Sequence, residues 1–230
     1  MVRLRRGPPP SELIRNGGRW TQRWLAIHGG AQTGDWATTA AKKVLSGELR
    51  NLAFGKCAFC ESVLGVTAYL EIEHYVAKTV NTALAFQWEN LFPICRLCNN
   101  AKSDIDHAGD LLKPDVDDPE NLLWLNPDSG ELQPKAALDG VVLSRIERTI
   151  ELCDLQRGPL CTKRIETMSS TIRWLERLHA QSGQLDKHLR DEWDRMTHSA
   201  AEYKFVIRHV FEIKGQPALA AFDRLKFEGS

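Results

Sequence analysis

The sequence predicts an α+β protein that is mostly α, with a small zinc-stapled centre of two strands and a helix, flanking helices and a helical carboxy-terminal region. Two CxxC pairs, at 57–60 and 95–98, have the spacing of metal knuckles. Between them, apolar and polar residues alternate over 70–74, which predicts a strand. From about residue 144 apolar residues recur in steps of three and four, which predicts helices.

The bulk composition allows a real hydrophobic core and points away from a membrane. The chain has 230 residues, of which 43% are apolar, and its formal net charge is zero. The opening "MVRLRRGPPP" lacks the apolar run of a signal peptide, and no stretch reaches the roughly 18 uncharged apolar residues of a membrane helix. We therefore expect a cytoplasmic protein without membrane association. In that compartment cysteine pairs are expected to bind metal rather than form disulfides.

Four regions are expected along the chain. Residues 1–53 form a basic amino-terminal arm and helices, and 54–106 form the metal-spaced centre. Residues 107–143 form an irregular acidic connection with a hairpin, and 144–230 form the helical carboxy-terminal region.

The amino-terminal region begins with an extended arm, because three consecutive prolines cannot enter a helix interior. The stretch "RWTQRWLAIHG" predicts a short helix closed by Gly29 and Gly30. Asp35 is expected to cap the next helix, over about 36–54.

Charge is unevenly distributed. Residues 1–24 hold six arginines against one glutamate, whereas residues 104–131 hold nine acids and one lysine. Arg3, Arg5 and Arg6 either contact phosphate or a partner protein, or belong to a solvated tail. The acidic stretch would repel nucleic acid, so it should face away from such a substrate or toward a protein.

The second half of the chain is expected to be connection and then helix. The stretch "NLLWL" predicts one strand, and Asp139-Gly140 predicts a tight turn into another. An apolar series from Leu185 to Val210 predicts one long amphipathic helix of about seven turns. Pro217 is expected to open a last short helix.

The cysteines divide into two groups. In each CxxC pair the two sulfurs of a tight turn point at one ion, and two such pairs complete a four-thiolate zinc site with Zn–S bonds of about 2.3 Å. The predicted ligands are Cys57, Cys60, Cys95 and Cys98. Such a site has no open coordination position, so the zinc is structural. Cys153 and Cys161 lack partner spacing and are expected to be buried thiols.

The stretch between the knuckles carries residues suited to a second metal. In "YLEIEHYVAK", alternation puts Glu71 and Glu73 on one side of a strand and Ile72, with possibly His74, on the other. Polar amides follow the second knuckle in "CRLCNNAK". Carboxylate and amide oxygens suit Mg²⁺ or Mn²⁺ better than zinc. A neutral histidine beside such an ion can deprotonate water.

These residues resemble the HNH, or ββα-metal, endonucleases, over roughly 54–106. The wording "IEHYVAK … WENLFPICRLCNNAK" is most similar to the PtuB-like branch, the HNH nucleases of Septu and retron anti-phage systems. The resemblance implies that His74 is the general base, that Glu73 and Asn99 bind the catalytic divalent ion, and that Asn90 pins the loop between the strands. It implies that Lys102 lies near the substrate phosphate or holds the helix.

This sequence departs from the family pattern at two points. Asn99 stands where many members carry the last histidine, and Ala77 stands where a proline is usual. Because neighbouring strand residues face opposite ways, either the strand bends at its end or Glu71 replaces Glu73 as ligand.

Two functions remain open from the sequence. The resemblance implies a metal-dependent endonuclease that hydrolyses phosphodiester bonds, with DNA favoured over RNA, acting in a defence complex beside an ATPase called PtuA. The alternative is a non-catalytic zinc-ribbon adaptor that binds nucleic acid or protein. An adaptor has no need of Glu73, His74 and Asn99, so these residues separate the two readings.

Overall fold

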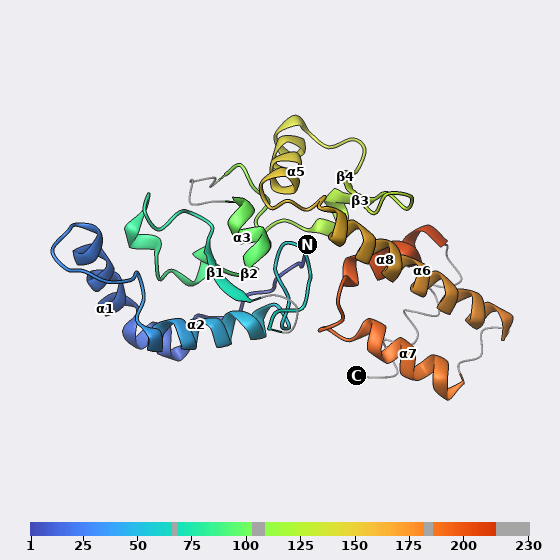
Figure 1. The fold of residues 1–230 in the computed structure, drawn as a ribbon, viewed down its shortest axis with the longest axis horizontal. Helices are drawn as coiled ribbons and strands as arrows, with labels where there is room; N and C mark the ends of the chain where they lie inside the picture. Colours follow the sequence, from blue (N-terminus) through green and yellow to red (C-terminus); the bar gives the residue numbers. More distant parts are fainter. Residues whose placement is uncertain (66–68, 103–108, 182–185, 215–230) are drawn as a thin grey trace.

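A computed structural model describes residues 1–65, 69–102, 109–181 and 186–214. Figure 1 shows an elongated molecule, with α1 and α2 at one end, the strands β1 and β2 with α3 in the middle, and α6, α7 and α8 at the other end. The mostly helical α+β class is confirmed. The helices are α1 (Ser11–His28), α2 (Thr39–Leu52), α3 (Arg96–Lys102), α4 (Pro119–Leu122), α5 (Gly140–Leu152), α6 (Gly158–Ala180), α7 (Lys187–Thr197) and α8 (Lys204–Lys214). The strands are β1 (Leu70–His74), β2 (Leu91–Cys95), β3 (Leu123–Leu125) and β4 (Leu132–Pro134), with 3₁₀ turns η1 (Thr82–Leu84) and η2 (Trp88–Asn90) before β2.

Both expected amino-terminal helices are present, but the first begins earlier than expected, at Ser11 directly after the prolines, and the second has a different cap. Helix α1 ends at Gly29, whose amide donates to Leu25 O at 2.9 Å. The predicted cap of α2 was wrong: Thr38 is the N-cap, and its hydroxyl accepts from the amide of Ala41 at 3.2 Å. Asp35 lies too early in the chain to reach the first turn and pairs with Lys42 instead.

The centre is the predicted strand, strand and helix. β1 and β2 pair antiparallel, with Glu73 opposite Phe92 and His74 opposite Leu91, and α3 follows β2 directly. Every residue of β2 is buried. Phe92 and Ile94 face a large core shared with the carboxy-terminal helices, whereas Leu91 faces a smaller aromatic core formed with α1 and α2. The strand pair therefore separates two cores, and its two faces offer different surroundings.

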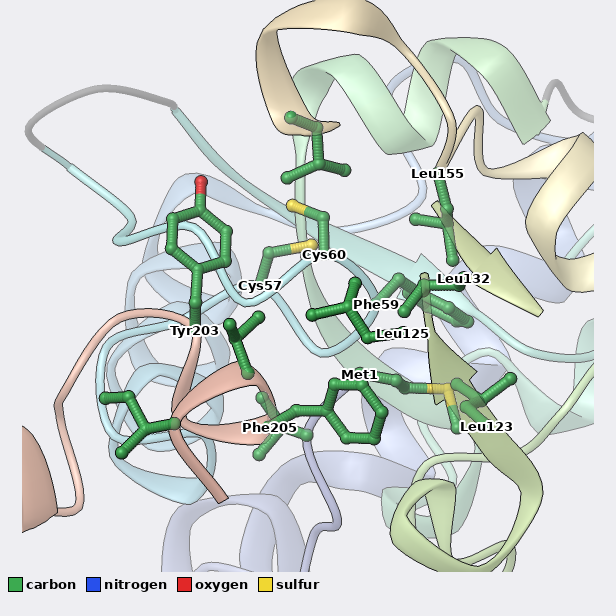
Figure 2. Packing of buried hydrophobic residues seen from close by; sticks show 14 of the residues in the cluster. Met1, Cys57, Phe59, Cys60, Leu123, Leu125, Leu132, Leu155, Tyr203 and Phe205 are labelled. Carbon is green, nitrogen blue, oxygen red and sulfur yellow. The ribbon is translucent and has the colours of Figure 1, made fainter. Parts of the chain in front are cut away.

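The larger core surrounds the cysteine knuckles. Figure 2 shows Cys57 and Cys60 beside Phe59, with Phe205 of α8 and the strand residues Leu123 and Leu125 packed on the same side. The predicted strand near 121–125 is therefore confirmed, as β3, and it pairs with β4. Burial of this apolar surface is the main stabilising contribution to the carboxy-terminal half.

Two predictions for the second half, one of a strand and one of a single long helix, were wrong. Asp139-Gly140 opens no strand: Asp139 is the N-cap of α5, and its Oδ1 accepts from the amides of Val141 and Val142. The long helix is broken between α7 and α8, where Tyr203 has a φ of 50°. Both helices contact α6 or each other, so the apolar spacing continues across the break. Leu185 and the expected helix at Pro217 lie outside the described residues.

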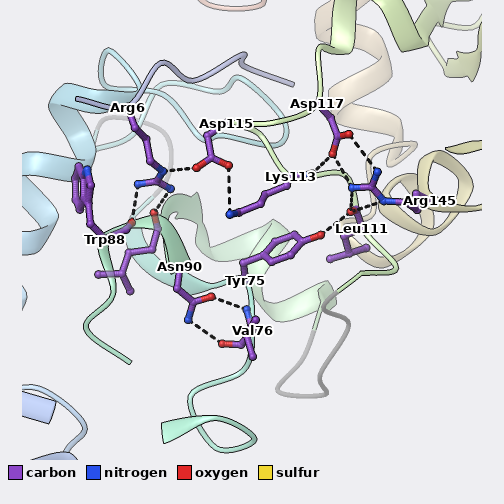
Figure 3. Close-up of polar contacts among 11 residues, drawn as sticks. Arg6, Tyr75, Val76, Trp88, Asn90, Leu111, Lys113, Asp115, Asp117 and Arg145 are labelled. Atoms are coloured by element: carbon purple, nitrogen blue, oxygen red, sulfur yellow. Dashed lines mark hydrogen bonds and ion pairs between the residues drawn. The ribbon is translucent and has the colours of Figure 1, made fainter. Parts of the chain in front are cut away.

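The amino-terminal arm is part of the body of the protein. The Val2 amide donates to Ala58 O and the Leu4 amide donates to Pro114 O, which carries the arm across the knuckle. Arg6 forms an ion pair with Asp115 and donates to the carbonyls of Trp88 and Leu91, each at 2.7 Å (Figure 3). Its guanidinium lies 4.4 Å from the ring centroid of Phe92. Arg6 therefore holds the start of β2 in place, and its hydrogen-bond donors are used within the fold.

The described part of the acidic stretch neutralises the chain's own arginines. Its four arginine–carboxylate pairs are Arg3–Asp118, Arg6–Asp115, Arg145–Asp117 and Arg208–Glu120. They connect the arm, α5 and α8 to one irregular segment. The acidic stretch therefore contacts arginines of the same chain, which the sequence analysis did not predict. Within the described ranges, every helix is too short or too polar to cross a bilayer.

Candidate active site

The four knuckle cysteines converge as predicted. Their Sγ atoms all lie within 4.8 Å of one another, and all four side chains are buried. Cys60 Sγ and Cys95 Sγ are 3.7 Å apart. A tetrahedron with Zn–S bonds of about 2.3 Å has edges of about 3.8 Å, so this spacing fits a zinc ion. The first knuckle is a turn before β1, and the second spans the end of β2 and the start of α3.

Hydrogen-bond donors surround the sulfurs and favour thiolates. The Cys95 amide donates to Cys57 Sγ at 3.3 Å, and Arg157 Nη1 lies 3.6 Å from Cys98 Sγ. Four thiolates and one zinc ion leave a net negative charge, which the Arg157 guanidinium offsets. Sequence spacing offered no signal for Arg157.

The other two cysteines are buried, as expected. Cys153 is fully buried and Cys161 is 8% exposed. Within the described chain, the four-cysteine cluster is the one group of three or more histidine, cysteine or acidic side chains close enough to share an ion.

One face of β1 carries acids that contact α3. Asn99 Nδ2 donates to Glu71 Oε2 at 2.5 Å, and Arg96 Nε lies 3.5 Å from Glu71 Oε1. Lys102 Nζ lies 2.6 Å from Glu73 Oε1. The predicted alternation places both glutamates on this side, and the helix start brings its amide and ammonium groups to them.

The two acids of this face differ in accessibility. The side chains of Glu73 and Lys102 are 7% and 3% exposed, so they form a buried ion pair. The Glu71 side chain is 29% exposed. Of the two carboxylates, Glu71 is therefore the more accessible and the one that contacts Asn99.

His74 occupies the opposite face, in an aromatic setting. It is 5% exposed, its ring meets Trp36 edge-on with centroids 4.5 Å apart, and Nε2 lies 3.1 Å from Ala85 O. Because a carbonyl only accepts, Nε2 carries the hydrogen and Nδ1 keeps the basic lone pair. Burial, helped by the charge of Lys78, lowers the pKa of His74 to about 3. The imidazole is thus neutral at physiological pH.

Asn90 pins the loop that follows β1. Its Oδ1 accepts from the Val76 amide at 2.7 Å, and its Nδ2 donates to Val76 O and Leu84 O (Figure 3). Because this loop also carries Ala85, Asn90 indirectly fixes the acceptor of His74. These bonds are the ones that the expected loop-shaping role requires.

The expected site residues thus fall into two sets. Glu73, Asn99 and Lys102 gather with Glu71 on the α3 side of β1, whereas His74 points into the aromatic core beside α2. The sequence reading missed Trp36, which covers His74, and the Ala85 carbonyl, which fixes its tautomer. Neither has a signal in spacing or composition.

Comparison with known proteins supports the family resemblance. Residues 57–105 match the model of the HNH endonuclease family. The chain is 28% identical over 181 residues to a Septu protein PtuB of Bacillus thuringiensis, covering 76% of this chain and 66% of that protein. It is 33% identical over 97 residues to a Septu protein PtuB of Bacillus mycoides, covering 34% of this chain and 33% of that protein. The matched stretches thus span about two thirds and one third of these relatives, respectively. The chain is therefore similar to HNH endonucleases across its cysteine-bound centre and to Septu PtuB proteins over most of its length.

Proposed function

We propose that this protein is a metal-dependent HNH endonuclease that hydrolyses nucleic-acid phosphodiester bonds. The observation that carries the proposal is the two-strand and helix centre, held by four converging cysteines, with a neutral histidine at the end of β1 and oxygen ligands facing α3. The match of residues 57–105 to the HNH family supports the same assignment.

The proposed chemistry assigns each group one role. It requires the end of β1 to rearrange, because His74 and the acids lie on opposite faces of the strand in this structure. His74 Nδ1 accepts a proton from the attacking water. Burial lowers the pKa of His74 to about 3, so the closed imidazole is unprotonated but a weak base, and the role requires exposure that returns the pKa toward 6.5. The imidazole is 5% exposed and its ring contacts Trp36, so side chains around it must move for a phosphate to approach. A bound Mg²⁺ or Mn²⁺ would supply positive charge for the leaving oxygen. Asn90 holds the loop and does not touch the ion.

Two carboxylates compete for the role of metal ligand. Glu73 fits the family position, but Lys102 occupies it as a counter-charge, so an ion would have to displace that ammonium. Glu71 already lies against Asn99, the proposed second ligand, and is the more exposed carboxylate. An ion between Glu71 and Asn99 requires the amide to turn its oxygen inward. Separate substitution of Glu71 and Glu73 by Gln distinguishes them, because only the ligand's loss raises the metal concentration needed for cleavage.

The wider assignment extends the resemblance to relatives named Septu protein PtuB. We propose that the protein is the nuclease effector of a cytoplasmic anti-phage complex, that it acts with a PtuA-like ATPase, and that DNA is its substrate in preference to RNA.

The test is cleavage of plasmid DNA and of RNA with added Mg²⁺ or Mn²⁺, with and without the candidate ATPase. His74→Ala should lower the cleavage rate roughly 10²–10⁴-fold, the share of a general base. His179→Ala, on an exposed helix end, should keep the wild-type rate. Equal rates for the wild type and His74→Ala would remove the catalytic assignment.

A second candidate is the non-catalytic zinc-ribbon adaptor. The closed state of the site favours it: Lys102 neutralises Glu73, and His74 is almost fully buried. An adaptor would bind nucleic acid or protein equally well with or without Mg²⁺ and would cleave neither substrate under any partner condition.

A further inference from the structure

A cavity of about 400 Å³ lies away from the strand pair, between the amino-terminal arm, the turn after α2 and helix α8. Cationic side chains dominate its charged lining: Arg3, Arg5, Lys56, Lys204 and Arg208. Two acids, Glu61 and Glu120, line it as well. The chain as a whole has zero formal net charge, so this local surplus of positive charge is a concentrated feature.

Both acids of the cavity are already engaged. Glu120 accepts from Arg208 Nη1, and Glu61 Oε2 accepts from the Phe205 amide at 3.1 Å. Lys56 is almost fully buried and donates to Ala201 O at 2.9 Å. Burial lowers the pKa of Lys56, and the nearby charge of Arg208 acts in the same direction, against Glu61. Five cationic side chains therefore share the cavity with two acids that already have partners.

Two arginines retain unused hydrogen-bond donors. Arg5 is exposed and makes no hydrogen bond or ion pair with any residue that the structure describes. Arg208 Nε is buried, and no described residue accepts from it. A planar guanidinium fork matches a phosphate, whose oxygens accept two such bonds at once. An anion in the cavity would satisfy these donors and would lie beside several cationic side chains.

An aromatic ring lies beside these cations. Phe54 lines the same cavity and is 50% exposed, an unusual setting for a large apolar side chain. A cationic groove with an accessible aromatic face is the arrangement that holds a phosphate and stacks the adjoining base. The volume lies in the range of small-ligand sites, about 300–1,000 Å³.

We propose that this cavity binds the phosphate and base of a nucleotide unit, either within a nucleic-acid strand or as a free nucleotide. The site shares no residue with the proposed catalytic set, so the inference does not depend on cleavage. For a nuclease it would provide a second hold on the substrate, outside the scissile position.

The experiment measures binding in a His74→Ala background without added divalent ion, so cleavage does not interfere. The probes are a fluorescein-labelled 12-nucleotide single-stranded DNA, followed by anisotropy, and AMP, followed by calorimetry. Arg5→Glu should weaken binding about tenfold and flatten the salt dependence. Phe54→Asn should weaken it about fivefold or more through loss of stacking. Asn tolerates the positive φ of 53° at this position, so the backbone should be retained.

The matched control is Arg19→Glu, the same charge reversal on an exposed arginine of α1 that lies outside the cavity. It should change binding less than twofold, by the general charge effect alone. If Arg5→Glu and Phe54→Asn weaken the binding of DNA alone, the ligand is a nucleic-acid strand. If they weaken the binding of AMP alone, the ligand is a free nucleotide. Equal effects of Arg5→Glu and Arg19→Glu on both probes would overturn the proposal. If the wild type binds a probe in an Arg5-dependent way but cleaves no substrate, the nuclease proposal fails and the proposal of a nucleotide site is kept.

Discussion

The two faces of β1 differ in their charge and in the groups that surround them. Toward α3, Glu71 and Glu73 meet an amide and an ammonium group, so this face is charged and internally paired. Toward α2, His74 meets Trp36 and a backbone carbonyl, so that face is aromatic and neutral. Glu73 and His74 are neighbours in sequence, yet the strand pleat places them in these opposite settings.

The difference shows that one strand can hold a carboxylate and an imidazole in separate environments. Paired with Lys102, the Glu73 carboxylate has a counter-charge at 2.6 Å. Buried among rings, the imidazole has its pKa lowered to about 3 and stays unprotonated. The four-cysteine cluster lies at one end of the strand pair, since Cys95 is the last residue of β2 and Cys98 lies in α3. The following predictions test this division.

Removing the zinc site should break both faces at once. Structural zinc supplies roughly 10–16 kcal/mol of apparent binding free energy in small zinc domains, so Cys95→Ser should unfold the centre. Zinc content by mass spectrometry should fall well below one ion per chain, and the near-UV circular dichroism should collapse. Cys161→Ser should keep both signals, because the hydroxyl can still donate to Gln156 O as the thiol does. Full zinc content in Cys95→Ser would contradict the four-thiolate site.

The charged face should respond unequally to its two acids. Glu73→Gln leaves the Lys102 ammonium buried without its counter-charge and should lower the free energy of unfolding by about 3–5 kcal/mol. Glu71→Gln removes a half-exposed pair with Arg96 and should cost under about 1 kcal/mol. Urea unfolding measures both. Adding Lys102→Met to Glu73→Gln should recover more than half of the loss, and equal costs for the two single variants would deny the difference in burial.

The loop below His74 should depend on Asn90. Asn90→Ala removes three side-chain hydrogen bonds and takes the side-chain partner from the Val76 amide and carbonyl, at a cost of about 2–4 kcal/mol, while Leu84 O keeps the Gln87 amide. Asn16→Ala, on the half-buried side of α1, should cost under about 1 kcal/mol. Denaturant unfolding compares the two. A cost for Asn90→Ala no larger than for Asn16→Ala would mean that the loop is held by other contacts.

The burial of neutral His74 should make the free energy of unfolding depend on pH. The pKa of His74 is about 3 when folded, below the ordinary value of 6.5, so the unfolded chain binds more protons between these values. Its stabilising contribution is complete above pH 6.5 and declines as pH falls toward 3, by about 2 kcal/mol at pH 5. His74→Phe keeps a ring beside Trp36 and removes this titration. Urea unfolding at pH 7.5 and 5.0 should show a smaller decline for the variant, while other titrating groups affect both proteins alike.

Much of the centre was predictable because its signals are local. CxxC spacing fixes which sulfurs share an ion, and alternation over 70–74 fixes which glutamates share a face. The errors also have local causes. An Asp-Gly pair suits a tight turn and equally a helix N-cap, and the choice at Asp139 follows from what comes next. An apolar stripe survives a short break when both helices pack on one core, which hid the end of α7.

The surroundings of the proposed site were less predictable because they depend on distant segments. Arg6 was expected either to contact phosphate or a partner or to lie in a solvated tail. It instead donates to the carbonyls of Trp88 and Leu91 and pairs with Asp115, more than a hundred residues away in sequence. Trp36 covers His74 from the turn between α1 and α2. Periodicity predicts faces and spacing predicts knuckles, but neither predicts which loop closes over a side chain.

The contacts around the first knuckle also set an order of events during synthesis. Lys56 bonds Ala201 O and the Phe205 amide bonds Glu61, across 145 and 144 residues of chain. A nascent polypeptide can bring its four thiols together once residue 98 has left the ribosome. The contacts of Lys56 and Glu61 with Ala201 and Phe205 can form only after the start of α8 has emerged. Contacts of such separation are formed late and slowly. Synthesis must therefore pass α8 before the four-cysteine centre is shielded from solvent.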